Sequence, residues 1–131
     1  MTASAQVEIF PSVPPRHYSR ASRVGDLVFM SGLCARDPER GYETVGTTLE
    51  EQCTVIFRRI QETLHEAGTD LANTVKVTVF LADIRTRDAL VPIVQHYFAD
   101  PPPPITIVET KLVGPRDLLE VEVTAAVVSG D

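Results

Sequence analysis

Three residues that can carry positive charge lie within two positions of a tyrosine near the start of the chain. Arg16 and His17 precede Tyr18, and Arg20 follows it. A guanidinium can bind a carboxylate through two parallel hydrogen bonds, and an imidazole exchanges a proton near neutral pH. The segment is therefore a candidate anion-binding site with His17 available as an acid or base. The alternative for His17 is a loop histidine that is simply exposed to solvent.

A candidate acid–base carboxylate lies near the other end of the chain, where apolar and polar residues alternate. In a strand, Leu119, Val121, Val123 and Ala125 would share one face, and Glu120, Glu122 and Thr124 would share the other. A glutamate in such a position is usually solvated. Glu120 is thus a catalytic candidate only where a cleft covers it. Ser31, directly before Gly32, either caps the end of a strand or contacts a ligand.

The remaining sulfur and imidazole groups show no spacing that is typical of a metal site or a disulfide framework. Cys34 and Cys53 are too few and too far apart for a metal site or a disulfide framework. His17, His65 and His96 match no metal-binding motif. Cys53 falls on the apolar stripe of a predicted helix. Cys34 lies near the candidate site without an evident histidine partner, so a nucleophilic role is the less favoured reading. We expect no metal.

The chain has 131 residues, with 12 Lys and Arg against 18 Asp and Glu, which gives a formal net charge of −6. This length predicts one domain, 1–131, that begins with an extended segment over 1–14. The acidic balance argues against nucleic-acid binding. No signal peptide and no membrane-spanning run is evident, so we expect a cytoplasmic protein without a membrane partner. A domain of this size has little room for a deep pocket, so its site is expected at the surface or between copies.

The elements that must position these residues follow from turn signals and periodicity. The predicted strands cover 24–31, 75–81, 105–109 and 118–128, and the predicted helices cover 47–68 and 86–98. Gly25-Asp26 is typical of a type II′ turn, 32–46 is a loop with room for a short hairpin, and Pro92 is expected to kink the second helix or delay its start. The order predicts an α+β fold in which two helices cover one face of a mixed sheet.

With these elements in place, the sequence resembles the Rid family, also called YjgF or L-PSP, from about Pro14 to Val128. The matching pieces, in order, are Tyr18-Ser19, Arg23 to Gly32, Glu51-Gln52, Val75 to Leu81 with Asp83, Tyr97-Phe98, and Leu119 to Val123. The resemblance implies a chorismate-mutase-like fold and a homotrimer with ligand clefts between neighbouring subunits. It also implies hydrolysis of amino-acid-derived enamines and imines without a metal or organic cofactor.

The family pattern transfers to this chain only in part. Tyr18, Ser31 and Glu120 match the tyrosine, serine and glutamate of the family cleft. Three other cleft positions are replaced by apolar residues: an arginine that holds the substrate carboxylate by Ile105, an asparagine by Val91, and a cysteine or threonine by Ile107. The cleft thereby loses its usual anion anchor and becomes more apolar. We therefore expect an anchor on another wall, supplied by Arg16 or Arg20 with His17 available as an acid or base, and a substrate other than the usual amino-acid-derived imine.

Two classes of function follow. In the first, the protein is a cofactor-free hydrolase or deaminase, or a related acid–base catalyst, in which Glu120 activates water or transfers a proton while Tyr18 and Ser31 orient the substrate. An aminomuconate-deaminase-like branch of the family, which also carries basic residues near Tyr18, suggests a catabolic variant of this role. In the second, the protein is a non-catalytic trimer that binds a small ligand or has a regulatory role. RNA cleavage is disfavoured by the negative charge.

Overall fold

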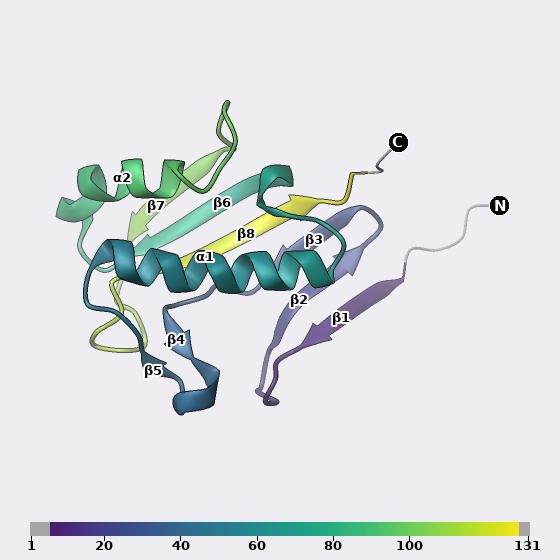
Figure 1. Ribbon diagram of the computed structural model, residues 1–131, viewed down its shortest axis with the longest axis horizontal. Coiled ribbons are helices and arrows are strands. Elements are labelled where there is room, and N and C mark those ends of the chain that lie inside the picture. The colour runs from purple at the N-terminus through teal and green to yellow at the C-terminus, as the bar shows by residue number, and fades with distance from the viewer. Residues whose placement is uncertain (1–5, 129–131) are drawn as a thin grey trace.

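A six-stranded mixed sheet runs through the centre of the computed structural model, which describes residues 6–128 (Figure 1). Across the sheet, the strands are β1 (Val7–Pro11), β2 (Ser19–Val24), β3 (Leu27–Met30), β8 (Leu119–Ala126), β6 (Thr74–Leu81) and β7 (Ile105–Glu109). Only the β6–β7 pair is parallel; the other neighbours are antiparallel. β7 can therefore follow β6 only through a crossover, which α2 provides.

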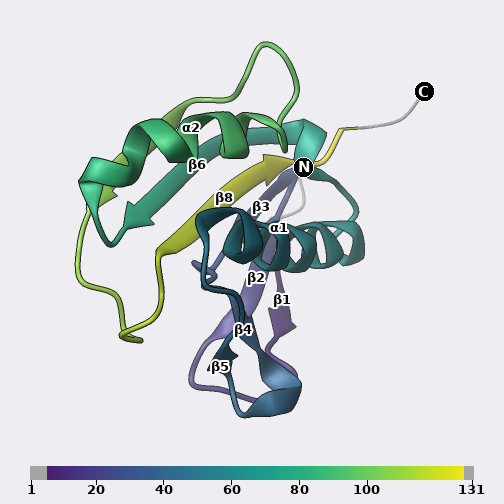
Figure 2. The same cartoon turned by 60° about the vertical axis from the view of Figure 1, so that its left-hand side comes forward.

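Both helices, α1 (Leu49–Glu66) and α2 (Arg87–Gln95), lie on the same face of this sheet (Figure 2). Short 3₁₀ turns cover Pro38–Arg40, Leu71–Asn73 and Ile84–Thr86, and a small hairpin joins β4 (Arg36–Asp37) to β5 (Glu43–Thr44). The predicted α+β fold, with two helices on one face of a mixed sheet, is confirmed. Within residues 6–128, no helix combines the length and the apolar character needed to cross a membrane.

The core lies between the sheet and α1, and the alternation in the sequence explains it. Every second residue is buried in β8 and in the part of β6 from Val77 to Leu81, while the residues between them face away; Val75, beside a shift in register, is exposed. The apolar stripe of α1, which includes Ile56, Ile60 and Leu64, is completely buried against the sheet. Burying one such side chain contributes roughly 1.5–3 kcal/mol. Within residues 6–128, no helix lies on the other face of the sheet.

The ends of α1 are set by local signals. The Thr48 side chain accepts a hydrogen bond from the backbone N–H of Glu51, and the Glu51 carboxylate accepts one from the backbone N–H of Thr48, which completes a capping box. Hydrogen bonds from the Thr47 and Thr48 backbone and side chains hold the pKa of Glu51 below its usual value. Gly68 follows the helix at φ 93°, a left-handed conformation that suits glycine.

Gln52 is a fully buried polar residue in the first turn of α1. Its Nε2 donates to the carbonyl oxygens of Gly46 and Arg116, each at 3.0 Å, and its Oε1 accepts from the N–H of Leu118 at 2.9 Å. One amide therefore joins the loop before α1 to the loop between β7 and β8. A satisfied buried amide of this kind fixes the positions of the backbone segments that it bonds.

The N-terminal part of the fold differs from the prediction. The segment expected to be merely extended over 1–14 contains β1, an edge strand that pairs with β2. Of the residues of β1 only Phe10 is buried, so the alternation of apolar and polar residues is too weak to predict a strand. The strand predicted over 24–31 corresponds to β3, which is shorter than predicted. Its hairpin partner is β2, on the other side of the turn at Gly25-Asp26. The turn itself is confirmed: Gly25 has φ 57°, whereas Asp26 is not left-handed, as in type II′.

The second helix is shorter than predicted. It begins at Arg87, so Pro92 lies within it and does not delay its start, and it ends at Gln95 instead of Phe98. The following backbone N–H groups, at 96–98, bond to carbonyls three residues earlier, which continues the helix as a tighter turn. The stacked rings of Phe57 and Tyr97, whose centroids are 4.2 Å apart, attach this end of α2 to α1.

Candidate functional site

A pocket of about 370 Å³ lies where β3 ends and β8 begins. Five residues predicted from the sequence line it, namely Arg16, His17, Tyr18, Ser31 and Glu120. Its other lining residues are Gly32, Leu33, Cys34, Arg36, Tyr42, Arg59 and Val113. The structure thus brings together residues separated by about a hundred positions in the sequence, and we call this cavity the Glu120 pocket.

The backbone that follows β3 explains why Glu120 lies in the pocket. Leu33 and Val121 exchange two backbone hydrogen bonds, of 2.9 and 3.0 Å, so the segment after β3 runs beside the start of β8. Glycine at position 32 leaves room for the Glu120 carboxylate where it lies, because a Cβ there would be 2.7 Å from Glu120 Oε2. Glu120 is on the polar side of β8, opposite Phe80 of β6, and it is half-buried instead of solvated.

Cys34 contacts the Glu120 carboxylate. Its Sγ donates to Glu120 Oε1 at 3.6 Å, and its side chain is buried. Burial, together with the negative charges of Asp117 and Glu120, raises the pKa of the Cys34 thiol to about 12. The group therefore stays protonated at neutral pH, as a hydrogen-bond donor to the carboxylate and not as a nucleophile. Cys53, in contrast, is part of the core, as predicted.

Tyr18 and Ser31 form the wall beside β2. The Ser31 Oγ donates to the carbonyl oxygen of Ser19 at 2.7 Å, which leaves its lone pairs to accept a hydrogen bond from a ligand. Tyr18 is 38% exposed, and the His17 ring meets the Tyr18 ring edge-on with 4.9 Å between centroids. Both tyrosine and serine thus present polar groups that can orient a small molecule.

The three predicted cations do not share one location. The Arg16 guanidinium lies 4.0 Å from the centroid of the Tyr42 ring, a cation–π contact at the pocket. Arg20 lies outside the lining of the Glu120 pocket. It forms an ion pair with Glu66 of α1, with N–O distances of 2.7 and 3.1 Å, and its Nε donates to the Pro11 carbonyl oxygen. Arg20 is therefore committed to joining β2 to α1.

The three apolar replacements lie elsewhere in the chain. Val91, Ile105 and Ile107 line a separate groove of about 290 Å³, together with Arg87, Val94, Gln95 and Pro102. Ile105 and Ile107 pair with Val77 and Val79 of β6, which are buried on the helix-covered side of the sheet. We call this hollow the α2–β7 groove. Within one chain it does not join the Glu120 pocket.

Two pocket residues, Arg36 and Arg59, are partly buried and are not ordinary surface charges. Arg36 forms an ion pair with Asp117, a buried carboxylate that also accepts from Thr44 Oγ1 at 3.1 Å and from the Gly114 N–H at 2.9 Å. Arg59 is half-buried on α1. The helical spacing of Arg59 shows only that it lies beside the apolar stripe. The 33–36 segment covers Arg59 because that segment pairs with β8. The sequence around Arg59 does not indicate this contact.

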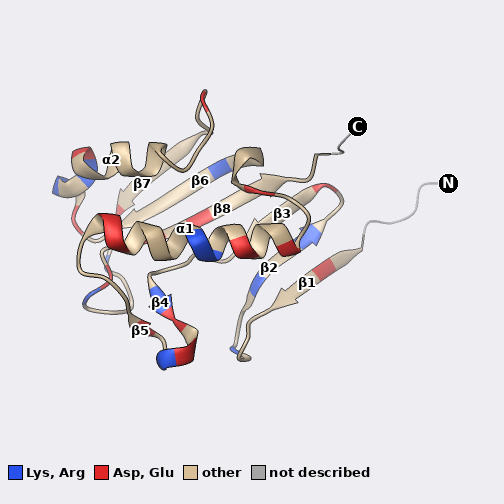
Figure 3. Ribbon diagram, viewed as in Figure 1, with Lys and Arg blue, Asp and Glu red and all other residues tan. Residues whose placement is uncertain are grey.

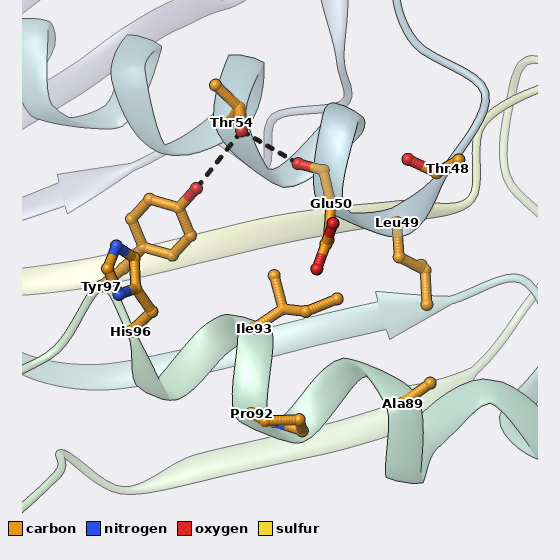
Figure 4. A pocket seen from close by; sticks show the side chains of 9 residues that line it. All are labelled: Thr48, Leu49, Glu50, Thr54, Ala89, Pro92, Ile93, His96 and Tyr97. Atoms are coloured by element: carbon orange, nitrogen blue, oxygen red, sulfur yellow. Dashed lines mark hydrogen bonds between the residues drawn. The ribbon is translucent and has the colours of Figure 1, made fainter.

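A larger hollow, of about 700 Å³, lies between the two helices (Figure 4). Among its polar groups, Thr54 Oγ1 donates to the Glu50 carbonyl oxygen at 3.0 Å and lies 3.5 Å from the Tyr97 hydroxyl. It contains none of the residues predicted for the site. The Glu120 pocket is therefore the better candidate. Among residues 6–128, no three His, Cys, Asp or Glu side chains are grouped so that they could hold a metal ion.

Comparisons with known proteins identify the family and the fold. A sequence model described as Endoribonuclease L-PSP matches residues 11–127. A RutC family protein of Pyrococcus abyssi is 34% identical over 108 residues, which cover 82% of this chain and 84% of the relative. The goat (Capra hircus) 2-iminobutanoate/2-iminopropanoate deaminase is 36% identical over 97 residues, covering 74% of this chain and 66% of that enzyme. The crystal structure of a YjgF family member from Neisseria meningitidis superposes with a TM-score of 0.82 at 24% identity, covering 95% and 98% of the two chains.

Proposed function

This chain belongs to the Endoribonuclease L-PSP family, also called the YjgF or Rid family, and we propose that it hydrolyses an enamine- or imine-type metabolite without a cofactor. The observation that carries the proposal is the position of Glu120 in a small pocket, with the Cys34 thiol donating to its carboxylate. A relative that is named as an imine deaminase supports the same class of reaction. The pocket volume, about 370 Å³, suits a small metabolite.

The proposed reaction requires one group that can take up and return a proton. An enamine first tautomerises to the imine. Glu120 then accepts a proton from water as the oxygen attacks the carbon of the C=N bond, and it returns a proton to the nitrogen. The tetrahedral intermediate collapses to a carbonyl compound and ammonia, so one water is consumed. Tyr18 and Ser31 orient the substrate from the opposite wall. The atoms balance without any redox partner.

We propose further that three copies assemble and that a neighbour's α2–β7 groove completes each cleft. The sheet face without helices carries exposed apolar side chains, Leu27, Phe29 and Val108, whose exposed fractions are 40, 43 and 41%. Exposed apolar side chains on such a face favour association of copies. With the neighbour's Val91, Ile105 and Ile107 as its second wall, the cleft would contact an apolar moiety at the place where an arginine at position 105 would hold a carboxylate.

Ammonia release from freshly generated 2-aminoacrylate and from imines with larger apolar groups tests the proposal. We expect Glu120→Gln to lower turnover at least 100-fold, in the range that acid–base catalysis supplies (roughly 10²–10⁴). Glu122→Gln, on the same strand but exposed, is the matched control and is expected to keep wild-type turnover. Equal rates for Glu120→Gln and wild type would overturn the role of Glu120. Binding of small acids without turnover of any imine would favour the non-catalytic ligand-binding role.

A further inference from the structure

Arg59 forms part of the α1 wall of the Glu120 pocket. It lies in the middle of the helix, where Arg58 and Arg59 separate acidic residues toward both ends (Figure 3). Its Nη1 donates to the carbonyl oxygens of Cys34 and Arg36, each at 3.3 Å. The segment that accepts these two long hydrogen bonds also contains Cys34, which contacts Glu120. The bonds therefore fix the Arg59 guanidinium relative to the Glu120 carboxylate. Arg58, the preceding residue, is exposed.

The Arg59 guanidinium has no carboxylate partner within residues 6–128. The acidic residues that influence it, Glu62 and Asp37, form no ion pair with it there, and its Nε and Nη2 make no hydrogen bond with the described residues. Burial lowers the pKa of Arg59, because a partly desolvated cation is disfavoured. A half-buried cation with free donors gains more from an anionic ligand than an exposed one does.

The charges that line the pocket favour an anion as well. Three arginines line it, Arg16, Arg36 and Arg59, against one carboxylate, Glu120. Arg36 is neutralised by its ion pair with Asp117. Two arginines thus remain against one glutamate, and the pocket is locally positive in a chain whose net charge is −6. Attraction of a small anion into this pocket is therefore expected to be local and not a property of the whole surface.

We infer that Arg59 is the anion anchor of the Glu120 pocket and binds a carboxylate of the substrate. Arg16, stacked on Tyr42, contributes a second positive group, and the reacting C=N group then lies toward Glu120. The substrate class is a carboxylate-bearing imine or enamine held from the α1 wall, and this identification of the reacting group rests on the proposed function. The anchor thereby lies in the same chain as Glu120, whereas the family pattern places an arginine at position 105.

Equilibrium binding of a matched pair of probes tests the anchor separately from catalysis. The probes are 2-oxobutanoate and its neutral amide, 2-oxobutanamide, titrated by calorimetry into the full chain. We expect Arg59→Gln to weaken 2-oxobutanoate binding at least tenfold and to leave the amide unchanged, because only the acid loses a charge-assisted hydrogen bond. Arg58→Gln is the matched control and is expected to bind both probes like wild type. Thermal unfolding shows whether Arg59→Gln remains folded.

A second variant separates the two proposals. Glu120→Gln is expected to bind 2-oxobutanoate at least as well as wild type while turnover is lost. If Arg59→Gln binds the acid like wild type, or if wild type fails to bind the acid in preference to the amide, the anchor is overturned even when imine turnover is observed. If Arg59 governs acid binding but no imine is hydrolysed, the anchor stands and the proposed reaction fails. Should Arg59→Gln unfold, Arg59→Lys, which keeps the charge but loses the planar fork, is expected to weaken acid binding by an intermediate factor.

Discussion

The Glu120 pocket and the α2–β7 groove differ in almost every chemical respect. The pocket is lined by arginines, a histidine, two tyrosines and a carboxylate, and Cys34 and Arg36 contact the carboxylates of Glu120 and Asp117. The groove is lined mainly by apolar side chains between a helix and the edge strand of the sheet. A site that both catalyses a reaction and selects its substrate needs a polar surface and an apolar surface. In the proposed function the two surfaces divide the work: the pocket would supply charge and proton transfer, and the groove would supply shape.

The sharpest test of this division is to inactivate each surface in a different copy. Glu120→Gln removes the proton-transfer group, and Ile105→Glu places a charge in the apolar groove. We expect each variant alone to lose at least 100-fold in turnover. If the two surfaces meet between copies, refolding an equal mixture restores activity, since about a quarter of the clefts then combine two unaltered walls by random assembly.

Ammonia release before and after mixing measures this effect, with size-exclusion chromatography as a check on assembly. A mixture of either variant with itself is the control and is expected to stay inactive. An equal mixture that remains as inactive as its components would contradict the shared cleft. The pocket would then have to act with residues of its own chain alone.

A smaller effect is expected from adding a positive charge to the groove. Ile105→Arg supplies the arginine that the family pattern has at this position. We expect turnover of 2-aminoacrylate to rise about tenfold, because a guanidinium can hold the carboxylate of an amino-acid-derived imine. Thr106→Arg is the matched control: it is the next residue of β7 and faces the other side of the sheet. An equal gain from both arginines would indicate a nonspecific charge effect.

The smallest expected effect concerns stability at alkaline pH, which should depend on the pocket and not on the groove. The pKa of Cys34 is raised to about 12, so the folded protein keeps a proton that the unfolded chain loses above about pH 9. Stability is therefore expected to fall as the pH rises from about 9 toward 12. Cys34→Ala should reduce this fall, whereas Ile107→Val should leave it unchanged.

Urea unfolding at pH 8 and at pH 11 measures this difference. Cys53, whose pKa is also raised to about 12 by burial, stays in every variant and provides a constant background. A pH dependence that is the same in Cys34→Ala and wild type would mean that the pocket thiol does not lose its proton in this range.

Local signals predicted most of the fold, and long-range contacts explain what they missed. The capping residues and apolar stripe of α1 lie within a few turns of one another, so the sequence alone located that helix. The β1 strand escaped prediction because it is an exposed edge whose partner is set by pairing. The family resemblance identified Tyr18, Ser31 and Glu120, and the structure places them in one pocket. The commitment of Arg20 to Glu66 depends on a contact across 46 residues.

Arg59 was missed for the same reason. Its sequence neighbours show only that it lies on a helix, beside the apolar stripe. Its place in the pocket depends on the 33–36 segment, which is held against β8 by the Leu33–Val121 pair. A residue becomes a pocket residue here because another part of the chain covers it, and no helical periodicity carries that information.

The buried amide of Gln52 has a consequence for how this protein can change during evolution. Gln52 holds the base of the loop between β7 and β8 through Arg116 and Leu118, while the tip of that loop carries Val113, which is 95% exposed and lines the Glu120 pocket. Because the base is anchored independently of the tip, residues at position 113 can be exchanged with little effect on folding. Substrate preference can therefore diverge among descendants of this chain by single substitutions at a position that the core does not constrain.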